Sequence, residues 1–133
     1  MSLAFSDCLK RGKIKPFSRG KRFAPQELKT AEFDLERAHK TFKEGDFKWA
    51  TIQLYYAMFH AARAMIYSRN FRECSHYCLV EAIRALFVET QRIPVTLLEG
   101  LIEAKDLRED ADYHSRWSKK SCKKLLGTAP AIP

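Results

Sequence analysis

The segment from Arg108 to His114 carries the residue types needed to cleave a phosphodiester without a metal. A guanidinium keeps its charge and presents a planar set of donors that fits phosphate, so Arg108 is suited to hold and polarise a scissile phosphate. An imidazole has an unperturbed pKa of about 6.5 and exchanges protons near neutral pH, so His114 is suited to act as general base or acid. The pair is chemically suited to cleave RNA through its 2′-hydroxyl.

The spacing of this pair sets a geometric condition. Six residues of unbroken helix rotate about 600° and rise about 9 Å, which leaves the two side chains about 120° apart. They can share one phosphate only if the helix ends near residues 110–113 or if a partner chain completes the site. The alternative is an ordinary i, i+4 ion pair between Arg108 and Asp112, with His114 near a helix terminus.

The charges around the pair have opposed interpretations. Glu109, Asp110 and Asp112 either orient His114 and raise its pKa, or repel RNA. A metal site built from Asp110, Asp112 and His114 is a further alternative, but the spacing matches no standard ligand pattern, and we expect neither a metal nor another cofactor. The residues expected to contribute to binding beside the pair are Glu109, Asp112, Tyr113, Arg116, Lys119 and Lys120.

Other residues that bind metals or stack on bases have simpler interpretations. Cys74, His76 and Cys78 have C-x-H-x-C spacing, but no second ligand pair lies at zinc-finger spacing, so buried thiols are favoured over zinc. His60 lies in an apolar segment and is expected to be a satisfied core histidine. The aromatic side chains near it are expected in the core or at an interface; they are Tyr55, Tyr56, Phe59 and Tyr67.

Cysteine usage and hydropathy predict a cytoplasmic protein. The four cysteines follow no tight disulfide spacing and no secretory signal is evident at the N-terminus, so we expect reduced thiols. The most apolar stretch, residues 47–67, is interrupted by Lys48, Gln53, His60 and Arg63, which argues against a membrane span.

The net charge of +8 is concentrated at the two ends of the chain. Residues 1–22 carry seven Lys or Arg against Asp7, and residues 116–133 carry five with no acid. The intervening residues carry twelve against fifteen acids. This distribution predicts either basic ends that bind a polyanion or simply solvated tails.

The hydrophobic periodicity predicts an all-α protein, an up-and-down four-helix bundle with a short additional C-terminal helix and a basic N-terminal arm. Helices are expected from Pro25 to about Gly45, from Asp46, as cap, to about Ser68, after Ser75, and after a capping box at Thr96 and Glu99. A weak apolar stripe at Trp117, Cys122, Leu125 and Leu126 predicts the short fifth helix. The expected domains are a flexible arm (1–24), the bundle (25–126) and a tail (127–133).

Three stretches carry a resemblance to a known family. "QLYYAMFHAARAMIYSRN", "SHYCLVEAIRALF" and "LREDADYHS" resemble the HEPN superfamily (higher eukaryotes and prokaryotes nucleotide-binding), specifically its small stand-alone bacterial and archaeal members. The third stretch matches the family motif of arginine, four to six residues, and histidine. Glu109 follows the arginine where the family often has Asn, Asp or His, and Arg116 lies where some members have tyrosine.

The resemblance implies a helical homodimer whose Arg108 and His114 line a cleft between the subunits. It also implies a metal-independent endoribonuclease that acts as the toxin of a toxin-antitoxin pair, with a small nucleotidyltransferase as antitoxin. The alternative is a non-catalytic module that binds a nucleotide, RNA or the nucleotidyltransferase. A helical interaction protein without nucleic acid is the third possibility.

Overall fold

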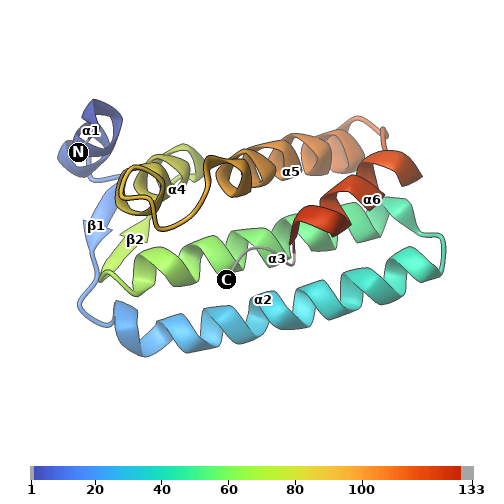
Figure 1. Ribbon diagram of the computed structural model, residues 1–133, viewed down its shortest axis with the longest axis horizontal. Helices are drawn as coiled ribbons and strands as arrows, with labels where there is room; N and C mark the ends of the chain where they lie inside the picture. The colour runs from blue at the N-terminus through green and yellow to red at the C-terminus, as the bar shows by residue number, and fades with distance from the viewer. Residues whose placement is uncertain (1, 130–133) are drawn as a thin grey trace.

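The computed structural model describes residues 2–129, which are almost entirely helical (Figure 1). The elements in chain order are α1 (Leu3–Lys10), β1 (Ile14–Pro16), α2 (Gly20–Lys43), α3 (Phe47–Tyr67), β2 (Phe71–Glu73), α4 (His76–Ile83), the π-helical turn η1 (Arg84–Val88), α5 (Val95–Tyr113) and α6 (Lys119–Thr128). The predicted all-α class is confirmed, because the only β structure in residues 2–129 is one antiparallel pair of three-residue strands.

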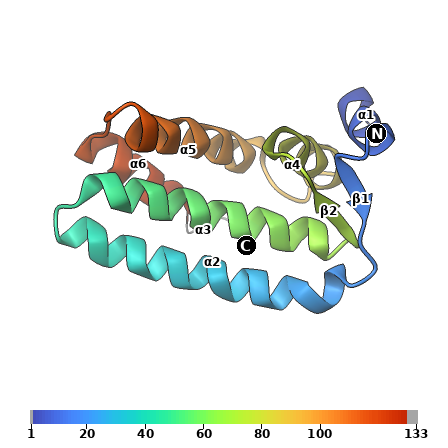
Figure 2. The same ribbon diagram turned by 180° about the vertical axis from the view of Figure 1, so that it is seen from behind.

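Helix α3 forms the centre of the fold. It lies between α2 on one side and α4 and α5 on the other, and α6 packs across it (Figures 1 and 2). Its large buried side chains, Leu54, Met58 and Ile66, join the core with Leu79 of α4 and Leu98 of α5. This helix is therefore buried on two sides by its neighbours.

The helix boundaries agree in part with the sequence prediction. Asp46 caps α3 as expected, since its carboxylate accepts a hydrogen bond from the backbone N–H of Trp49 at 3.2 Å. Ser75 likewise caps α4. The expected capping box at Thr96 and Glu99 is wrong: α5 begins at Val95, after an extended Pro94 that supplies no side-chain cap.

The up-and-down arrangement holds for α2, α3 and α5, which run successively antiparallel (Figure 1). The expected third helix is divided between α4 and η1. The short C-terminal helix is confirmed as α6, in which Cys122 and Leu125 are buried. The predicted tail is partly wrong, because Gly127 lies within α6 and Ala129 is buried; its last residues, 130–133, lie outside the described residues.

The prediction of a flexible arm up to residue 24 is wrong. Residues 3–10 form α1, β1 pairs with β2, and α2 begins at Gly20 rather than Pro25. The physical reason is burial: Phe5 and Ile14 lie in the core at 0% and 1% exposure, and a buried large apolar side chain contributes about 1.5–3 kcal/mol. These few apolar side chains fix a segment whose composition is otherwise that of a solvated tail.

The prediction of reduced thiols is also wrong for two of the four cysteines. Cys8 of α1 and Cys78 of α4 form a disulfide with a Cα–Cα distance of 5.8 Å. Cys74 is exposed and Cys122 is buried, both as free thiols. Sequence spacing gave no signal because the partners are 70 residues apart and meet only when α1 folds onto α4. Within residues 2–129, no helix has the length and apolar character required to cross a membrane.

Candidate functional site

Helix α5 ends between the two residues of the predicted catalytic pair. Its last residue is Tyr113, and His114 follows as the C-cap. The N–H groups of His114 and Arg116 both donate to the carbonyl oxygen of Asp110, at 3.1 and 2.9 Å, while Ser115 has a φ of +53°. This is the usual way in which a left-handed residue closes a helix. The first of the two geometric alternatives, an end of the helix near residues 110–113, is therefore present.

The side chain of Arg108 lies against three tyrosine rings. Its guanidinium carbon is 5.1 Å from the ring centre of Tyr55, 5.8 Å from that of Tyr56 and 5.7 Å from that of Tyr113. Its Nη1 also donates a hydrogen bond of 3.3 Å to the hydroxyl of Tyr113. Such cation–π contacts hold a guanidinium without neutralising it. The Nε atom is buried and finds no hydrogen-bond acceptor among residues 2–129.

His76, the first residue of α4, completes this group, which we call the Arg108 cluster (Arg108, Tyr55, Tyr56, Tyr113 and His76). Its Nδ1 lies 3.3 Å from the hydroxyl of Tyr55, and its Nε2 is buried without a partner among the described residues. Burial, reinforced by the positive charge of Lys105, lowers the pKa of His76 to about 4. The ring is therefore neutral at physiological pH, and its tautomer decides whether Nδ1 accepts a hydrogen bond from the Tyr55 hydroxyl or donates one to it.

The two acidic neighbours of Arg108 are paired with cations. Asp112 lies 3.5 Å from Nη1 of Arg108, so the predicted i, i+4 ion pair is also present. Glu109 lies 2.7 Å from Nζ of Lys105, whose hydrogen bond lowers the pKa of the Glu109 carboxyl. These pairs reduce the negative potential beside Arg108 without removing it.

The remaining predicted residues line the exposed surface beyond the end of α5. His114 and Arg116 are exposed, and within residues 2–129 their side chains make no hydrogen bond. Lys119 and Lys120 are exposed in the first turn of α6, and Nζ of Lys119 lies 5.9 Å from the ring centre of Phe47. The structure thus brings Arg108, Asp112 and Tyr113 into contact, and it leaves the imidazole of His114 directed to solvent.

An exposed aromatic surface adjoins the cluster. Trp49 and Trp117 are 49% and 48% exposed, and Nζ of Lys48 lies between them, 5.3 and 5.7 Å from their ring centres. Tyr56 and Tyr113 of the Arg108 cluster are also exposed. Large exposed aromatic side chains grouped in this way are typical of surfaces that bind a partner.

The comparisons with known proteins bear on this arrangement. The HEPN domain model matches residues 25–132, which is most of the chain. The chain belongs to the HEPN domain family. The resemblance found in the sequence is thereby confirmed. A curated relative, the UPF0332 protein glr0978 of Gloeobacter violaceus, is 31% identical over 83 residues; the match covers 62% of this chain and 66% of the relative, just under two thirds of its length.

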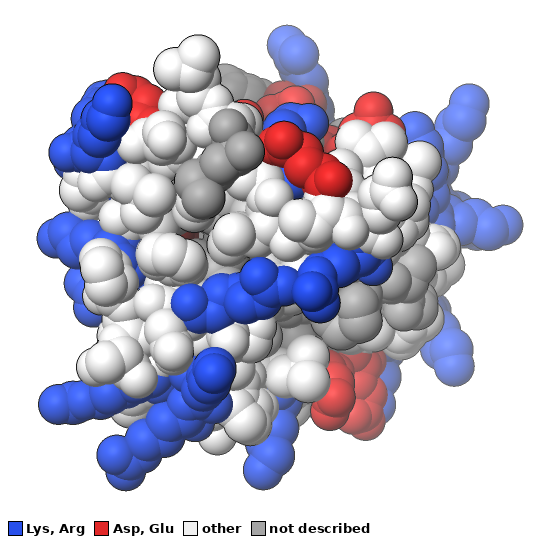
Figure 3. All heavy atoms as spheres, turned by 60° about the vertical axis from the view of Figure 1, so that its left-hand side comes forward, with Lys and Arg blue, Asp and Glu red and all other residues white. Residues whose placement is uncertain are grey.

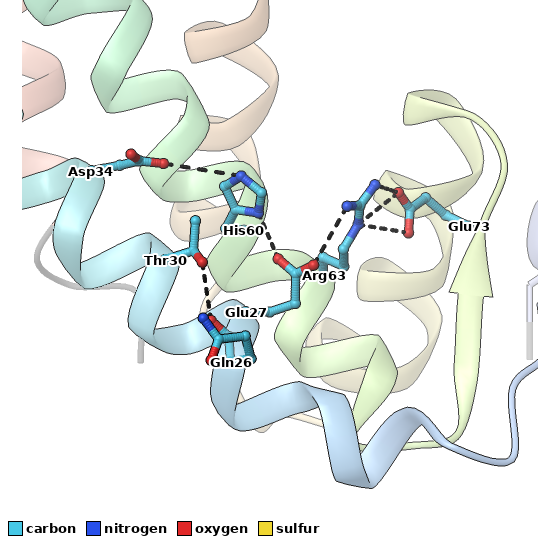
Figure 4. A network of polar contacts seen from close by, with 7 residues as sticks. All are labelled: Gln26, Glu27, Thr30, Asp34, His60, Arg63 and Glu73. Atoms are coloured by element: carbon cyan, nitrogen blue, oxygen red, sulfur yellow. Dashed lines mark hydrogen bonds and ion pairs between the residues drawn. The ribbon is translucent and has the colours of Figure 1, made fainter.

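A second polar cluster of the HEPN protein lies between α2, α3 and β2 (Figure 4). We call it the His60–Arg63 network (Glu27, Asp34, His60, Arg63 and Glu73). His60 places Nδ1 2.5 Å from Glu27 and Nε2 4.0 Å from Asp34. Arg63 contacts Glu27 at 3.5 Å and Glu73 at 2.7 Å. Carboxylates contact both ring nitrogens of His60, so the expectation that His60 is a satisfied histidine is confirmed.

Sequence reasoning missed two features of the Arg108 cluster. Tyr55 and Tyr56 were expected in the core or at an interface, and the signal for their role was their position in the family stretch "QLYYAMFH". His76 was set aside with Cys74 and Cys78 as a weak zinc pattern; Cys78 is in a disulfide. Among residues 2–129, no group of three or more potential ligands is arranged to hold a metal ion.

Proposed function

We propose that this HEPN protein is a metal-independent endoribonuclease that acts as a homodimer in the cytoplasm. In this proposal His114 takes the proton from the 2′-hydroxyl of RNA, and the 2′-oxygen attacks phosphorus while Arg108 binds the phosphate oxygens. The bond from phosphorus to the 5′-oxygen breaks, and His114 of the partner subunit protonates the leaving oxygen. The products are a 2′,3′-cyclic phosphate and a 5′-hydroxyl.

The observation that carries the proposal is the end of α5 at Tyr113. An unbroken helix would direct Arg108 and His114 to different faces, whereas the turn at residues 114–116 frees His114 from the helical register. Arg108 is oriented by rings that leave its charge in place, and its Nε has no acceptor among the described residues. Both properties suit a residue that binds a phosphate.

The exposed aromatic surface supports the homodimer. Tyr56 and Tyr113 lie against Arg108, and burial of these rings together with Trp49 and Trp117 against a second copy would exclude water from the phosphate site. Exclusion of water strengthens the interaction between a guanidinium and a phosphate. The isologous contact of a two-fold dimer would bring both copies of His114 to one groove.

Cleavage in the presence of EDTA tests the chemistry. We expect the purified protein to cut single-stranded RNA in EDTA and to leave 2′,3′-cyclic phosphate ends. His114→Ala should lower the rate about 10² to 10⁴-fold, which is the usual contribution of a general acid or base. His39→Ala is the matched control, because His39 is an exposed histidine of α2 remote from the Arg108 cluster in sequence. Full activity of His114→Ala would refute the mechanism.

A binding module without catalysis is the second candidate, and the Arg108–Asp112 ion pair favours it. A guanidinium that is already paired at 3.5 Å must exchange its carboxylate for phosphate before it can act. RNA or nucleotide binding with a steep salt dependence, together with intact RNA after long incubation, would support this candidate. Binding to a protein partner that does not respond to salt and no retention of RNA would instead indicate a helical interaction protein.

The proposed biological role is that of a toxin paired with a small nucleotidyltransferase. We expect expression of the wild-type chain to arrest growth, His114→Ala to permit growth, and co-expression of the nucleotidyltransferase encoded by the adjacent open reading frame to relieve the arrest. Arrest that persists with His114→Ala would separate toxicity from the proposed chemistry.

A further inference from the structure

The segment before residue 25 lies outside the family match and forms an ordered basic surface. Its β1 and the first turn of α2 lie against β2 and the end of α3. We call the surface formed by these four parts the amino-terminal platform. Two hydrogen bonds to Asn70 hold it in place. The backbone N–H of Phe17 donates to the carbonyl oxygen of Asn70 at 2.7 Å, and the backbone N–H of Lys21 donates to the side-chain Oδ1 of Asn70 at 3.3 Å. Gly20 fits so closely that an added Cβ would lie 2.3 Å from the carbonyl oxygen of Tyr67.

Aromatic rings form the centre of the platform. Phe17 and Phe23 stack with ring centres 5.9 Å apart and planes 6° apart, and Tyr67 meets Phe17 edge-on at 5.1 Å. Phe23 is 40% exposed. A pocket of about 260 Å³ opens beside them, lined by the three rings, Gln26 and Glu27. Rings exposed beside a pocket offer a surface on which a planar ligand can stack.

Cations bracket these rings. The guanidinium of Arg22 lies 5.9 Å from the ring centre of Phe23, and that of Arg72 lies 5.9 Å from the ring centre of Phe17. Lysine and arginine side chains spread over this end of the molecule, whereas acidic side chains lie in a few small groups (Figure 3). Within residues 2–129, no acidic side chain lies within ion-pair distance of Lys13, Lys15, Arg19, Lys21, Arg22 or Arg72.

The acids nearest to the pocket are occupied elsewhere. Glu27 faces His60 and Arg63, and Glu73 holds Arg63 at 2.7 Å with a side chain only 6% exposed. Asp7, the single acid of residues 1–24, pairs with Arg11 at 3.4 Å. The platform therefore presents uncompensated positive charge around the exposed ring of Phe23 and the partly buried rings of Phe17 and Tyr67.

We propose that the amino-terminal platform binds a single-stranded segment of RNA, with bases stacked on Phe23 and phosphates held by Arg22 and Arg72. The exposed ring of Phe23 offers a face for stacking, the two guanidinium groups offer donors for phosphate, and the amide of Gln26 supplies a donor and an acceptor for a base edge. A membrane surface would require apolar side chains free to insert, whereas these rings are bracketed by guanidinium groups. This inference rests on the proposed function for the choice of RNA.

The platform and the Arg108 cluster lie at positions that one strand can span. Tyr67 of the platform and Tyr55 of the cluster both belong to α3 and are separated by twelve residues, or about 18 Å along the helix axis. Twelve residues also rotate about 120° around the axis, so a strand that joins the two must pass around α3 and needs more than the roughly five nucleotides that 18 Å represents at the stacked-base rise of about 3.4 Å. The platform would hold RNA several nucleotides away from the bond that is cut.

The chain provides a matched control for a test. Phe33 and Arg37, also on α2, form a second exposed pair with the guanidinium 6.0 Å from the ring centre, and Phe33 is 61% exposed. The platform variant is Arg22→Gln with Phe23→Ala, and the control variant is Arg37→Gln with Phe33→Ala. Each removes one ring and one charge from the same helix. Both are made on a His114→Ala background, and circular dichroism verifies that they fold.

Fluorescence anisotropy with labelled single-stranded RNA of twelve and of three nucleotides measures the effect. We expect the platform variant to bind the twelve-nucleotide RNA about tenfold more weakly and with a smaller salt slope, and the control variant to change by less than twofold. Neither variant should alter binding of the three-nucleotide RNA. Equal losses in both variants, no loss in the platform variant, or a loss seen only on vesicles of anionic phospholipid would overturn the proposal.

The same proteins separate this inference from the proposed function. Without the His114 substitution, both variants should cut the three-nucleotide RNA at the wild-type rate. If the wild-type protein cuts no RNA but the platform variant still binds tenfold more weakly, the platform stands and the nuclease proposal fails. If the wild-type protein cuts RNA but the platform variant binds as tightly as the control variant, the nuclease proposal stands and the platform proposal fails.

Discussion

The Arg108 cluster and the His60–Arg63 network contain the same kinds of residue, include side chains of α3, and differ in how their polar atoms are satisfied. Each combines an arginine, a histidine and residues of α3. In the network, carboxylates face both nitrogens of His60 and both sides of Arg63 (Figure 4). In the cluster, Nε of Arg108 and Nε2 of His76 are buried without a partner among residues 2–129.

This difference separates a stabilising network from a candidate site. A buried polar atom without a hydrogen-bond partner costs about 1–3 kcal/mol, and a fold that retains two of them beside an exposed aromatic surface is suited to receive a ligand. Carboxylates that contact both nitrogens of His60 and the guanidinium of Arg63 leave nothing for a ligand to satisfy. We therefore expect substitutions in the cluster to change activity and those in the network to change stability.

Exchange of arginine for lysine gives the largest expected contrast. Arg108→Lys keeps the charge but loses the planar fork of donors, and it should lower the rate of RNA cleavage by about 10² to 10³-fold. Arg63→Lys, the matched change in the network, should lower the rate less than tenfold. Initial rates on a labelled RNA measure both. Comparable losses in the two variants would remove the distinction between the regions.

Removal of the disulfide should loosen the side of the fold that carries the cluster. Cys78 lies two residues after His76, so the cross-link to Cys8 fixes the start of α4. For a 70-residue separation, chain entropy predicts a loss of roughly 4 kcal/mol in the free energy of unfolding, and typical measured losses are about 2–4 kcal/mol. Urea denaturation of Cys8→Ser without reductant measures the loss, with Cys74→Ser as control. Identical midpoints for Cys8→Ser and wild type would contradict this role.

Loss of the cation in the network should cost stability. Arg63→Met leaves Glu27 and Glu73 without their shared partner, and the Glu73 side chain is only 6% exposed. We expect the free energy of unfolding to fall by about 2 kcal/mol, less than for a fully buried pair because Arg63 is itself 27% exposed. Lys40→Met removes an exposed pair with Glu36 and should cost under about 0.5 kcal/mol. Equal urea midpoints for Arg63→Met and Lys40→Met would contradict a stabilising role for the His60–Arg63 network.

The helices of the bundle could be predicted because apolar periodicity and helix caps are visible in a short stretch of sequence. Apolar residues at intervals of three and four, with Asp46 and Ser75 as caps, were sufficient for α3 and α4. The amino-terminal segment was missed because its structure depends on distant partners. Phe5 ends an apolar run of only three residues, Ile14 lies between two lysines, and β1 pairs with β2 across more than fifty residues. No local pattern encodes such contacts.

The residues of the candidate site could be named from the sequence, but the side chains that surround them could not. The spacing of Arg108 and His114 and the family motif marked both residues, while the tyrosine rings around Arg108 come from other turns of the fold. The same limit applied to His76, whose neutrality arises from burial beside Lys105 and Arg108 and not from its sequence neighbours. Burial is a property of the assembled bundle, so sequence reasoning could name the histidine without anticipating its protonation state.

The smallest expected effect is a pH dependence that comes from the cluster. Burial lowers the pKa of His76 to about 4, against about 6.5 in the unfolded chain, so the unfolded state binds the additional proton between these values. The free energy of unfolding should therefore decrease as pH falls from about 6.5 to 4. The groups that act on the ring from α3 and α5 are Tyr55, Lys105, Asp106, Arg108 and Glu109. After allowance for solvent screening of this half-buried ring, the loss should be about 1–2 kcal/mol.

Comparison of two histidine variants isolates this contribution. His76→Asn removes the titrating group and should flatten the dependence of the free energy of unfolding on pH between about 4 and 6.5. His39→Asn, on the exposed surface of α2, should leave it unchanged. Urea denaturation at a series of pH values measures both. A wild-type protein that becomes more stable on acidification through this range, or an unchanged slope in His76→Asn, would mean that His76 is charged in the fold and that its Nε2 has found an acceptor.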